Sequence, residues 1–96
     1  MDPAQLLIRL RETTMDLMDL HKELATIQMA EARARAEAWR DSSSSSAAGA
    51  ESESRYAAMD FTCDKMKVQG DIAALREDKD FLTAALEAFA AGVMEA

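Results

Sequence analysis

Few side chains in this sequence are of the types that catalyse reactions or bind metals. His21 is the single histidine and Cys63 the single cysteine. Neither stands at a metal-site spacing from other ligand residues. Asp60 and Asp64 flank Cys63 and disfavour its nucleophilic thiolate form. We therefore expect no catalytic residue, no cofactor and no metal, and a protein that is not an enzyme.

Two groups of charged side chains allow more than one interpretation. Arginines near the predicted bend create a potential phosphate site, but neighbouring acidic residues largely cancel their charge, which favours a solvated, salt-linked helix surface; they are Arg33, Arg35, Arg40 and Arg55. The acidic residues between positions 71 and 80 either imitate nucleic-acid phosphates or form a solvent-exposed face. Both interpretations stay open.

Charge and composition indicate the class of protein. The chain has 96 residues and 18 acidic against 11 basic side chains, a net charge of -7. This acidity disfavours general binding to nucleic acid or an anionic membrane. One cysteine excludes an intrachain disulfide and fits a reducing compartment. The chain shows neither a membrane-spanning apolar run nor a signal peptide at its start, so we expect a cytoplasmic protein.

The elements that carry these residues are predicted to be two long helices. Asp2 and Gln5 form a capping-box pattern around Pro3, so the first helix is expected over 3–41. The serine-rich segment 42–54 has nothing large to bury and reads as solvated loop, with Ser52 or Ser54 capping a second helix over 55–95. The whole chain is expected to be one helical-hairpin domain.

Apolar residues recur in both helices at alternating steps of three and four, which is the period of a coiled coil. In an antiparallel hairpin bent near residue 48, facing positions have numbers that add up to about 96, and the acidic Glu31 then meets the basic Lys65. Lys79 is expected to reach Asp16 on the flank of the opposite helix. The predicted fold class is all-α, an antiparallel, coiled-coil-like hairpin. We name its inward face the seam, formed by Leu10, Leu17, Leu24, Glu31, Lys65, Ile72, Leu75, Leu82 and Leu86.

Both helices carry further apolar residues away from the seam, whereas the surface helix of a monomer has a polar back. We name this second set the outer face: Ile8, Met15, Met18, Met29, Trp39, Met59, Met66 and Phe81. It predicts self-association, as a homodimeric four-helix bundle, or a different protein partner for the methionine-rich surface. A flexible amphipathic monomer is the third possibility.

The segments "ARAEAWRDS" and "GDIAALREDKDFLTAAL" resemble small helical proteins encoded by phages of actinobacteria. Those proteins have an alanine-rich first helix, a variable turn and a second helix with a similar leucine core. The resemblance covers most of the chain. It implies an accessory protein of the early or recombination region, without catalytic activity, acting in the host cytoplasm.

The chain is also similar in length to the WXG family of secreted helical hairpins, with a Trp near the bend. Trp39 is followed by Arg40-Asp41 and not by glycine, and "YAAMD" begins the second helix instead of following it. Both departures count against secretion. The leading function is therefore a non-enzymatic protein-interaction protein. Alternatives are an acidic inhibitor of a basic site on a host enzyme and a WXG-like secreted hairpin.

Overall fold

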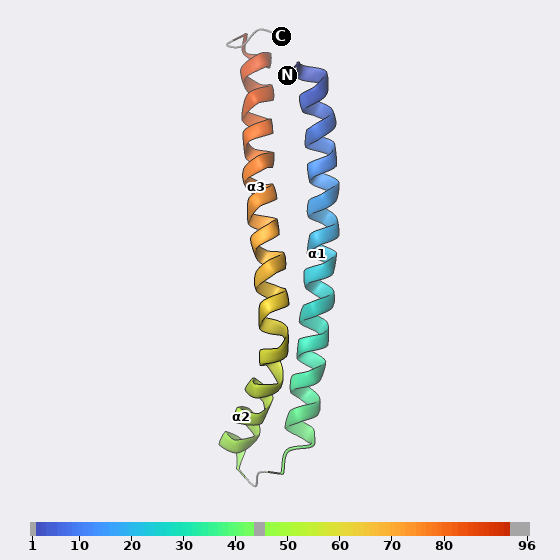
Figure 1. Ribbon diagram of the computed structural model, residues 1–96. Coiled ribbons are helices and arrows are strands. Elements are labelled where there is room, and N and C mark those ends of the chain that lie inside the picture. Colours follow the sequence, from blue (N-terminus) through green and yellow to red (C-terminus); the bar gives the residue numbers. More distant parts are fainter. Residues whose placement is uncertain (1, 44–45, 93–96) are drawn as a thin grey trace. The chain divides into compact units, whose positions relative to one another are not determined.

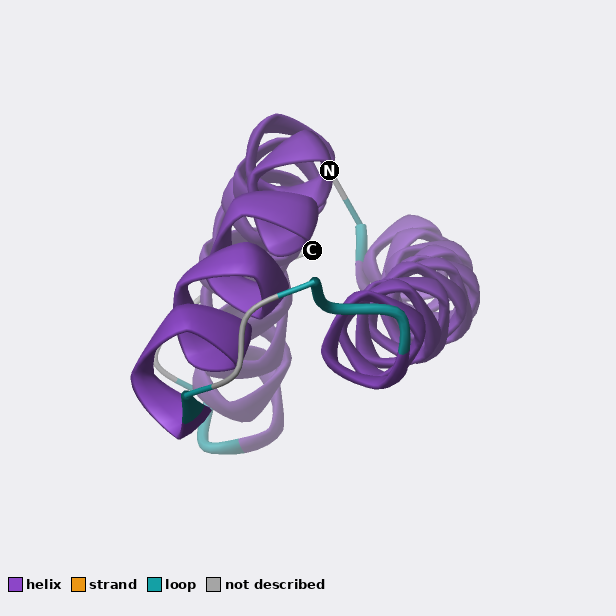
Figure 2. Ribbon diagram, turned by 90° about the horizontal axis from the view of Figure 1, so that it is seen from below, coloured by secondary structure: helices purple, strands orange, loops and turns teal. Residues whose placement is uncertain are grey.

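The computed structural model describes residues 2–43 and 46–92. Its elements are α1 (Pro3–Arg40), α2 (Ala47–Ala58), a single 3-10 turn η1 (Met59–Phe61) and α3 (Thr62–Ala90). Figure 2 shows helices and loops but no strand in this described part of the chain. The predicted all-α helical hairpin is confirmed. The four-helix bundle, which needs a second chain, stays a prediction.

Helix α1 begins at the capping box that the sequence indicates. The Gln5 amide donates to Asp2 Oδ1 at 2.8 Å, and the Asp2 amide donates to Gln5 Oε1 at 3.0 Å. These two bonds satisfy amides that a helix start leaves without partners. The helix ends at Arg40, one residue before the predicted end, although the Asp41 amide still donates to the Glu37 carbonyl at 2.8 Å.

The prediction of a loop over 42–54 is wrong for most of its length. Helix α2 begins at Ala47, and its N-cap is Ser46, whose side chain accepts from the Gly49 amide at 3.1 Å, so Ser52 and Ser54 are not the cap. Alanines at the start of α2 favour helix, and Ala50 and Ser54 are buried. Burial of small side chains therefore stabilises a segment that looked solvated. Residues 44 and 45 of the predicted loop lie outside the described residues.

The second arm also differs from the single helix predicted over 55–95. It consists of α2, η1 and α3 in succession, and α3 ends at Ala90. Gly92 follows with a φ of 75°, and its amide donates to the Phe89 carbonyl at 3.1 Å. A left-handed glycine just past the last turn terminates a helix in this way. Residues 93–95 of the predicted helix lie outside the described residues.

The chain divides into two compact units, and each contains part of both arms. The terminal unit (Met1–His21 and Gly70–Ala96) places the first half of α1 beside the later part of α3, with the start of α1 and the end of α3 at the same end of the unit (Figure 1). The bend unit (Lys22–Gln69) contains the rest of α1, α2, η1 and the start of α3. The single domain predicted for residues 1–96 stays a prediction.

Each unit has a small apolar core along the inward faces of its helices. In the terminal unit Leu6, Leu17, Ile72 and Leu82 are buried; in the bend unit the buried residues include Val68. The remaining seam residues are half-buried: Leu10, Leu24, Glu31, Lys65, Leu75 and Leu86. The inward side of α1 and α3 thus follows the alternating three-and-four spacing of the sequence.

Candidate functional site

An ion pair joins the two arms inside the bend unit. Lys65 Nζ on α3 contacts Glu31 Oε2 on α1, and the two side chains are only 26% and 15% exposed. That Oε2 atom is buried and has no partner of hydrogen-bond geometry in the described part of the chain. The Lys65 ammonium therefore supplies the counter-charge for Glu31. This is the pairing that the register predicted from the sequence requires.

The arginines near the bend do not converge on one site. Arg35 Nε donates to Ser54 Oγ at 3.4 Å and Arg35 also pairs with Glu51 at 3.6 Å, which ties α1 to α2. Arg55 pairs with the same Glu51 at 3.1 Å. The arrangement fits a salt-linked surface better than a phosphate site, because the guanidinium groups are already engaged by acidic side chains.

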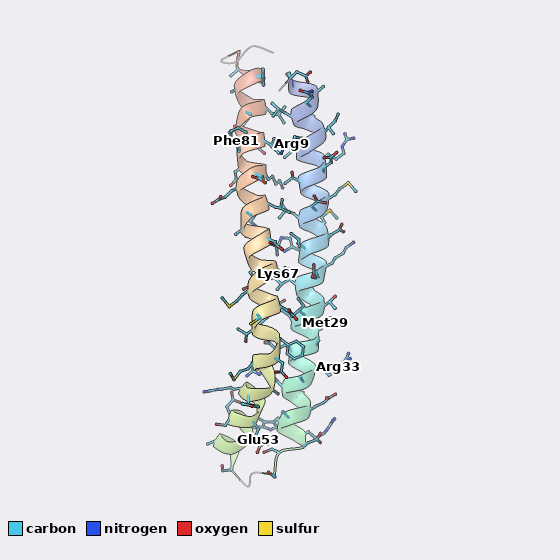
Figure 3. The ribbon with its side chains drawn as sticks, viewed as in Figure 1. Arg9, Met29, Arg33, Glu53, Lys67 and Phe81 are labelled. Atoms are coloured by element: carbon cyan, nitrogen blue, oxygen red, sulfur yellow. The ribbon has the colours of Figure 1, made fainter. Side chains whose placement is uncertain are left out.

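The other two arginines near the bend, Arg33 and Arg40, likewise do not form a shared binding site with them. Arg40 pairs with Asp41 at 3.4 Å, between two largely exposed side chains. Arg33 is exposed on α1 (Figure 3). Exposed pairs of this kind contribute about 0–1 kcal/mol to stability.

All eight residues of the outer face are exposed. Their exposed fractions run from 46% for Trp39 to 70% for Phe81, with Met15 at 60% and Met18 at 56%. The terminal unit carries Ile8, Met15, Met18 and Phe81, and the bend unit carries the other four residues: Met29, Trp39, Met59 and Met66. Phe81 on α3 and Met29 on α1 are labelled in Figure 3. Within its own unit each of these side chains remains accessible to a partner.

Two further exposed hydrophobic residues belong to this inventory, and the sequence interpretation missed both. Leu7 precedes Ile8 on α1, and Tyr56 lies near the end of α2. Leu7 falls beside the regular spacing of the outer face. Tyr56 stands at the start of the helix that the sequence predicts over 55–95, whereas α2 begins at Ala47, eight residues before position 55. A list of apolar residues off the seam would have included Leu7.

A groove runs between α1 and α3 on one side of the terminal unit. Its floor is apolar, and its edges carry three carboxylates; the lining residues are Asp16, Asp19, Leu20, Asp71, Ala74 and Leu75. We name it the acidic groove. The sequence interpretation missed it, because it is formed by the flanks of two helices far apart in the chain.

A second groove of the terminal unit is lined by Thr14, Leu17, Met18, His21, Arg76, Lys79 and Asp80. Lys79 therefore lines a different groove from Asp16, and no ion pair of Lys79 occurs among the described residues. The predicted Lys79–Asp16 pair is wrong, because Asp16 and Lys79 project from opposite flanks of the seam.

Chemistry-bearing residues do not assemble into a reactive site. Cys63 is exposed, and His21 is an exposed residue of the second groove. The described residues include no group of three or more histidines, cysteines or carboxylates arranged to hold a metal ion. Among the helices described, none combines the length and apolar character that crossing a membrane requires.

Comparison with protein-family models, with curated proteins and with solved structures found no significant match. The resemblances to phage accessory proteins and to WXG hairpins therefore remain predictions.

Proposed function

We propose that this hairpin is a non-enzymatic protein-interaction module that associates with a second copy of itself through its outer face. The observation that carries the proposal is the exposure of every large apolar residue of that face, from Ile8 near the start of α1 to Phe81 on α3. On α1, Ile8, Met15 and Met18 stand at helical spacing on one side, and contiguous exposed apolar surface of this kind marks interaction sites.

The free energies favour burial of this face over its exposure. Burying a methionine or phenylalanine side chain contributes roughly 1.5–3 kcal/mol. Three outer-face residues on α1 of the terminal unit, namely Ile8, Met15 and Met18, then offset part of the entropy lost on association. The net charge of -7 opposes self-association, but physiological salt screens charges beyond about 8 Å.

The biological role we attach to this association is that of an accessory protein. It agrees with the function implied by the resemblance to phage-encoded helical proteins. It also fits a reducing cytoplasm, since the chain carries a lone exposed cysteine, Cys63, which has no partner for an intrachain disulfide.

Sedimentation equilibrium of the full chain tests the proposal. The wild type is expected to sediment as a dimer at micromolar concentration, and Met15→Asp/Met18→Asp is expected to raise the dimer dissociation constant at least about tenfold. Gln28→Asp/Gln69→Asp is the matched control, because it adds the same two charges at exposed polar positions. A wild type that sediments as a monomer, or a control that dissociates equally, contradicts the proposal.

A further inference from the structure

The acidic groove of the terminal unit combines two kinds of surface. Leu20 from α1 and Leu75 from α3 are half-buried, and with Ala74 they form an apolar floor. Asp16 and Asp19 line the groove from α1. Residues three or four apart project from the same side of a helix, so both carboxylates belong to the same side of the groove.

Asp71 supplies a third carboxylate from the opposite side of the groove. It precedes Ala74 and Leu75 on α3 by about one helical turn. The groove is therefore edged by negative charge on both helices, and its lining contains no basic residue.

These three aspartates have no counterion within the described residues. The ion pairs of the described part involve Glu31, Asp41 and Glu51 as the acidic partners, and none of the three groove aspartates takes part in one. The second groove of the same unit carries Arg76 and Lys79 in addition to Asp80. The acidic groove therefore differs from the second groove in that its carboxylates share the lining with no basic side chain.

We infer that the acidic groove binds a basic amphipathic helix of a partner protein. Apolar side chains of that helix lie on the floor over Leu20 and Leu75, and its lysine or arginine side chains, one turn away, pair with Asp16, Asp19 and Asp71. This is the helix-in-groove mode of recognition. Complementary charge orients the helix and rejects acidic partners.

Charge at the contact itself favours a basic partner over a second copy as the occupant. Asp16, Asp19 and Asp71 line the groove without a basic residue, so they repel an acidic surface within the distance over which salt screens little and attract the side chains of a basic helix. The inference rests on the proposed protein-binding function, but it uses a surface that shares no residue with the outer face.

Synthetic peptides provide the probes. Three fluorescent peptides of about five helical turns, built from leucine, alanine and lysine, place lysine three, four or seven residues from leucine. A matched set replaces every lysine with glutamate. Fluorescence anisotropy against the full chain measures binding at low salt and at about 0.3 M salt, where exposed ion pairs are largely screened.

At least one lysine peptide is expected to bind, with an affinity that falls at high salt, and the glutamate peptides are expected not to bind. The variant Asp16→Asn/Asp19→Asn/Asp71→Asn should weaken binding about tenfold, the effect of several partly exposed ion pairs together. The control Asp60→Asn/Asp64→Asn/Asp80→Asn removes the same charge at exposed aspartates outside the groove and should bind like the wild type.

Failure of this inference differs from failure of the proposed self-association. Absence of lysine-peptide binding, or equal loss in the groove and control variants, overturns the inference. A groove variant that dimerises more tightly than the control overturns it too, because the groove would then be covered by a second copy. Met15→Asp/Met18→Asp should still bind the lysine peptide. If this variant loses dimerisation but keeps peptide binding, the result concerns the outer face and not the acidic groove.

Discussion

Lys65 on α3 places its ammonium against the buried Oε2 of Glu31 on α1, and this contact sets the level at which the two arms meet in the bend unit. Slipping one helix by a heptad would leave leucine facing leucine but would remove the counterion from Glu31. Half-buried charged pairs of this kind specify register more than they add stability. The pair therefore selects one register among the several that a repeating pattern allows.

Reversing one charge of this pair should destabilise the hairpin, and reversing both should restore part of the loss. Glu31→Lys sets two ammonium groups together at the seam and should cost about 1–3 kcal/mol, less than a fully buried pair because both side chains keep partial exposure. Glu31→Lys/Lys65→Glu should recover at least half. Urea denaturation of the single and double variants measures the coupling, and additive effects would mean that the two side chains do not meet.

Truncating two neighbouring residues of α3 should change the free energy of unfolding by very different amounts. Leu82 is 3% exposed and Phe81 is 70% exposed. Leu82→Ala should lower the free energy of unfolding by about 2–4 kcal/mol, because it leaves a cavity in the terminal unit. Phe81→Ala should change it by less than about 0.5 kcal/mol in samples dilute enough to be monomeric. Thermal melts at nanomolar concentration check both values, and similar losses would place Phe81 in the core.

The cap of α2 offers a local test of the bend. Ser46 accepts from the Gly49 amide at 3.1 Å, and Ser46→Ala should destabilise α2 by about 1 kcal/mol. Hydrogen exchange should then quicken at the first amides of α2. Ser43→Ala, at an exposed position outside any helix, is the control and should leave exchange unchanged. Equal exchange rates in the two variants would show that Ser46 is not the N-cap of α2.

The two described glycines of the second arm's later part should behave differently when replaced by alanine. Around Gly70 a Cβ atom meets nothing within 4 Å, and its backbone is helical, so Gly70→Ala should stabilise the chain by about 0.5–1 kcal/mol. Gly92 has a φ of 75°, so Gly92→Ala should destabilise the end of α3. Circular dichroism melts measure the two shifts, and a loss on Gly70→Ala would indicate a close neighbour that the isolated chain lacks.

The capping box at Asp2 and Gln5 and the inward spacing of α1 could be read from the sequence, because both depend on local chemistry and period. Helix α2 could not, since its buried residues, Ala50 and Ser54, are small and give no apolar signal. The sequence predicts too late an end for this helix, because the apolar pattern does not stop at Ala90. The left-handed backbone of Gly92 is what terminates α3 there.

The two grooves of the terminal unit could not be predicted from sequence patterns, for a different reason. A one-residue change of position moves a side chain by about 100° around a helix, so Asp16 and Leu17 point to different sides of α1. Whether Lys79 reaches Asp16 therefore depends on the rotation of both helices, which spacing alone does not determine. The acidic groove likewise exists only once Asp19 and Asp71 are brought to the same side.

Isotope-filtered NMR on a mixed sample tests the outer-face account most directly. Half of the chains carry ¹³C-methyl methionine, the other half are unlabelled, and the filter retains contacts between chains alone. The account predicts intermolecular contacts from the methyl groups of Met15 and Met18, which are exposed within one chain. A dimeric sample in which neither Met15 nor Met18 shows an intermolecular contact, or a sample with no intermolecular contacts at millimolar concentration, would contradict it.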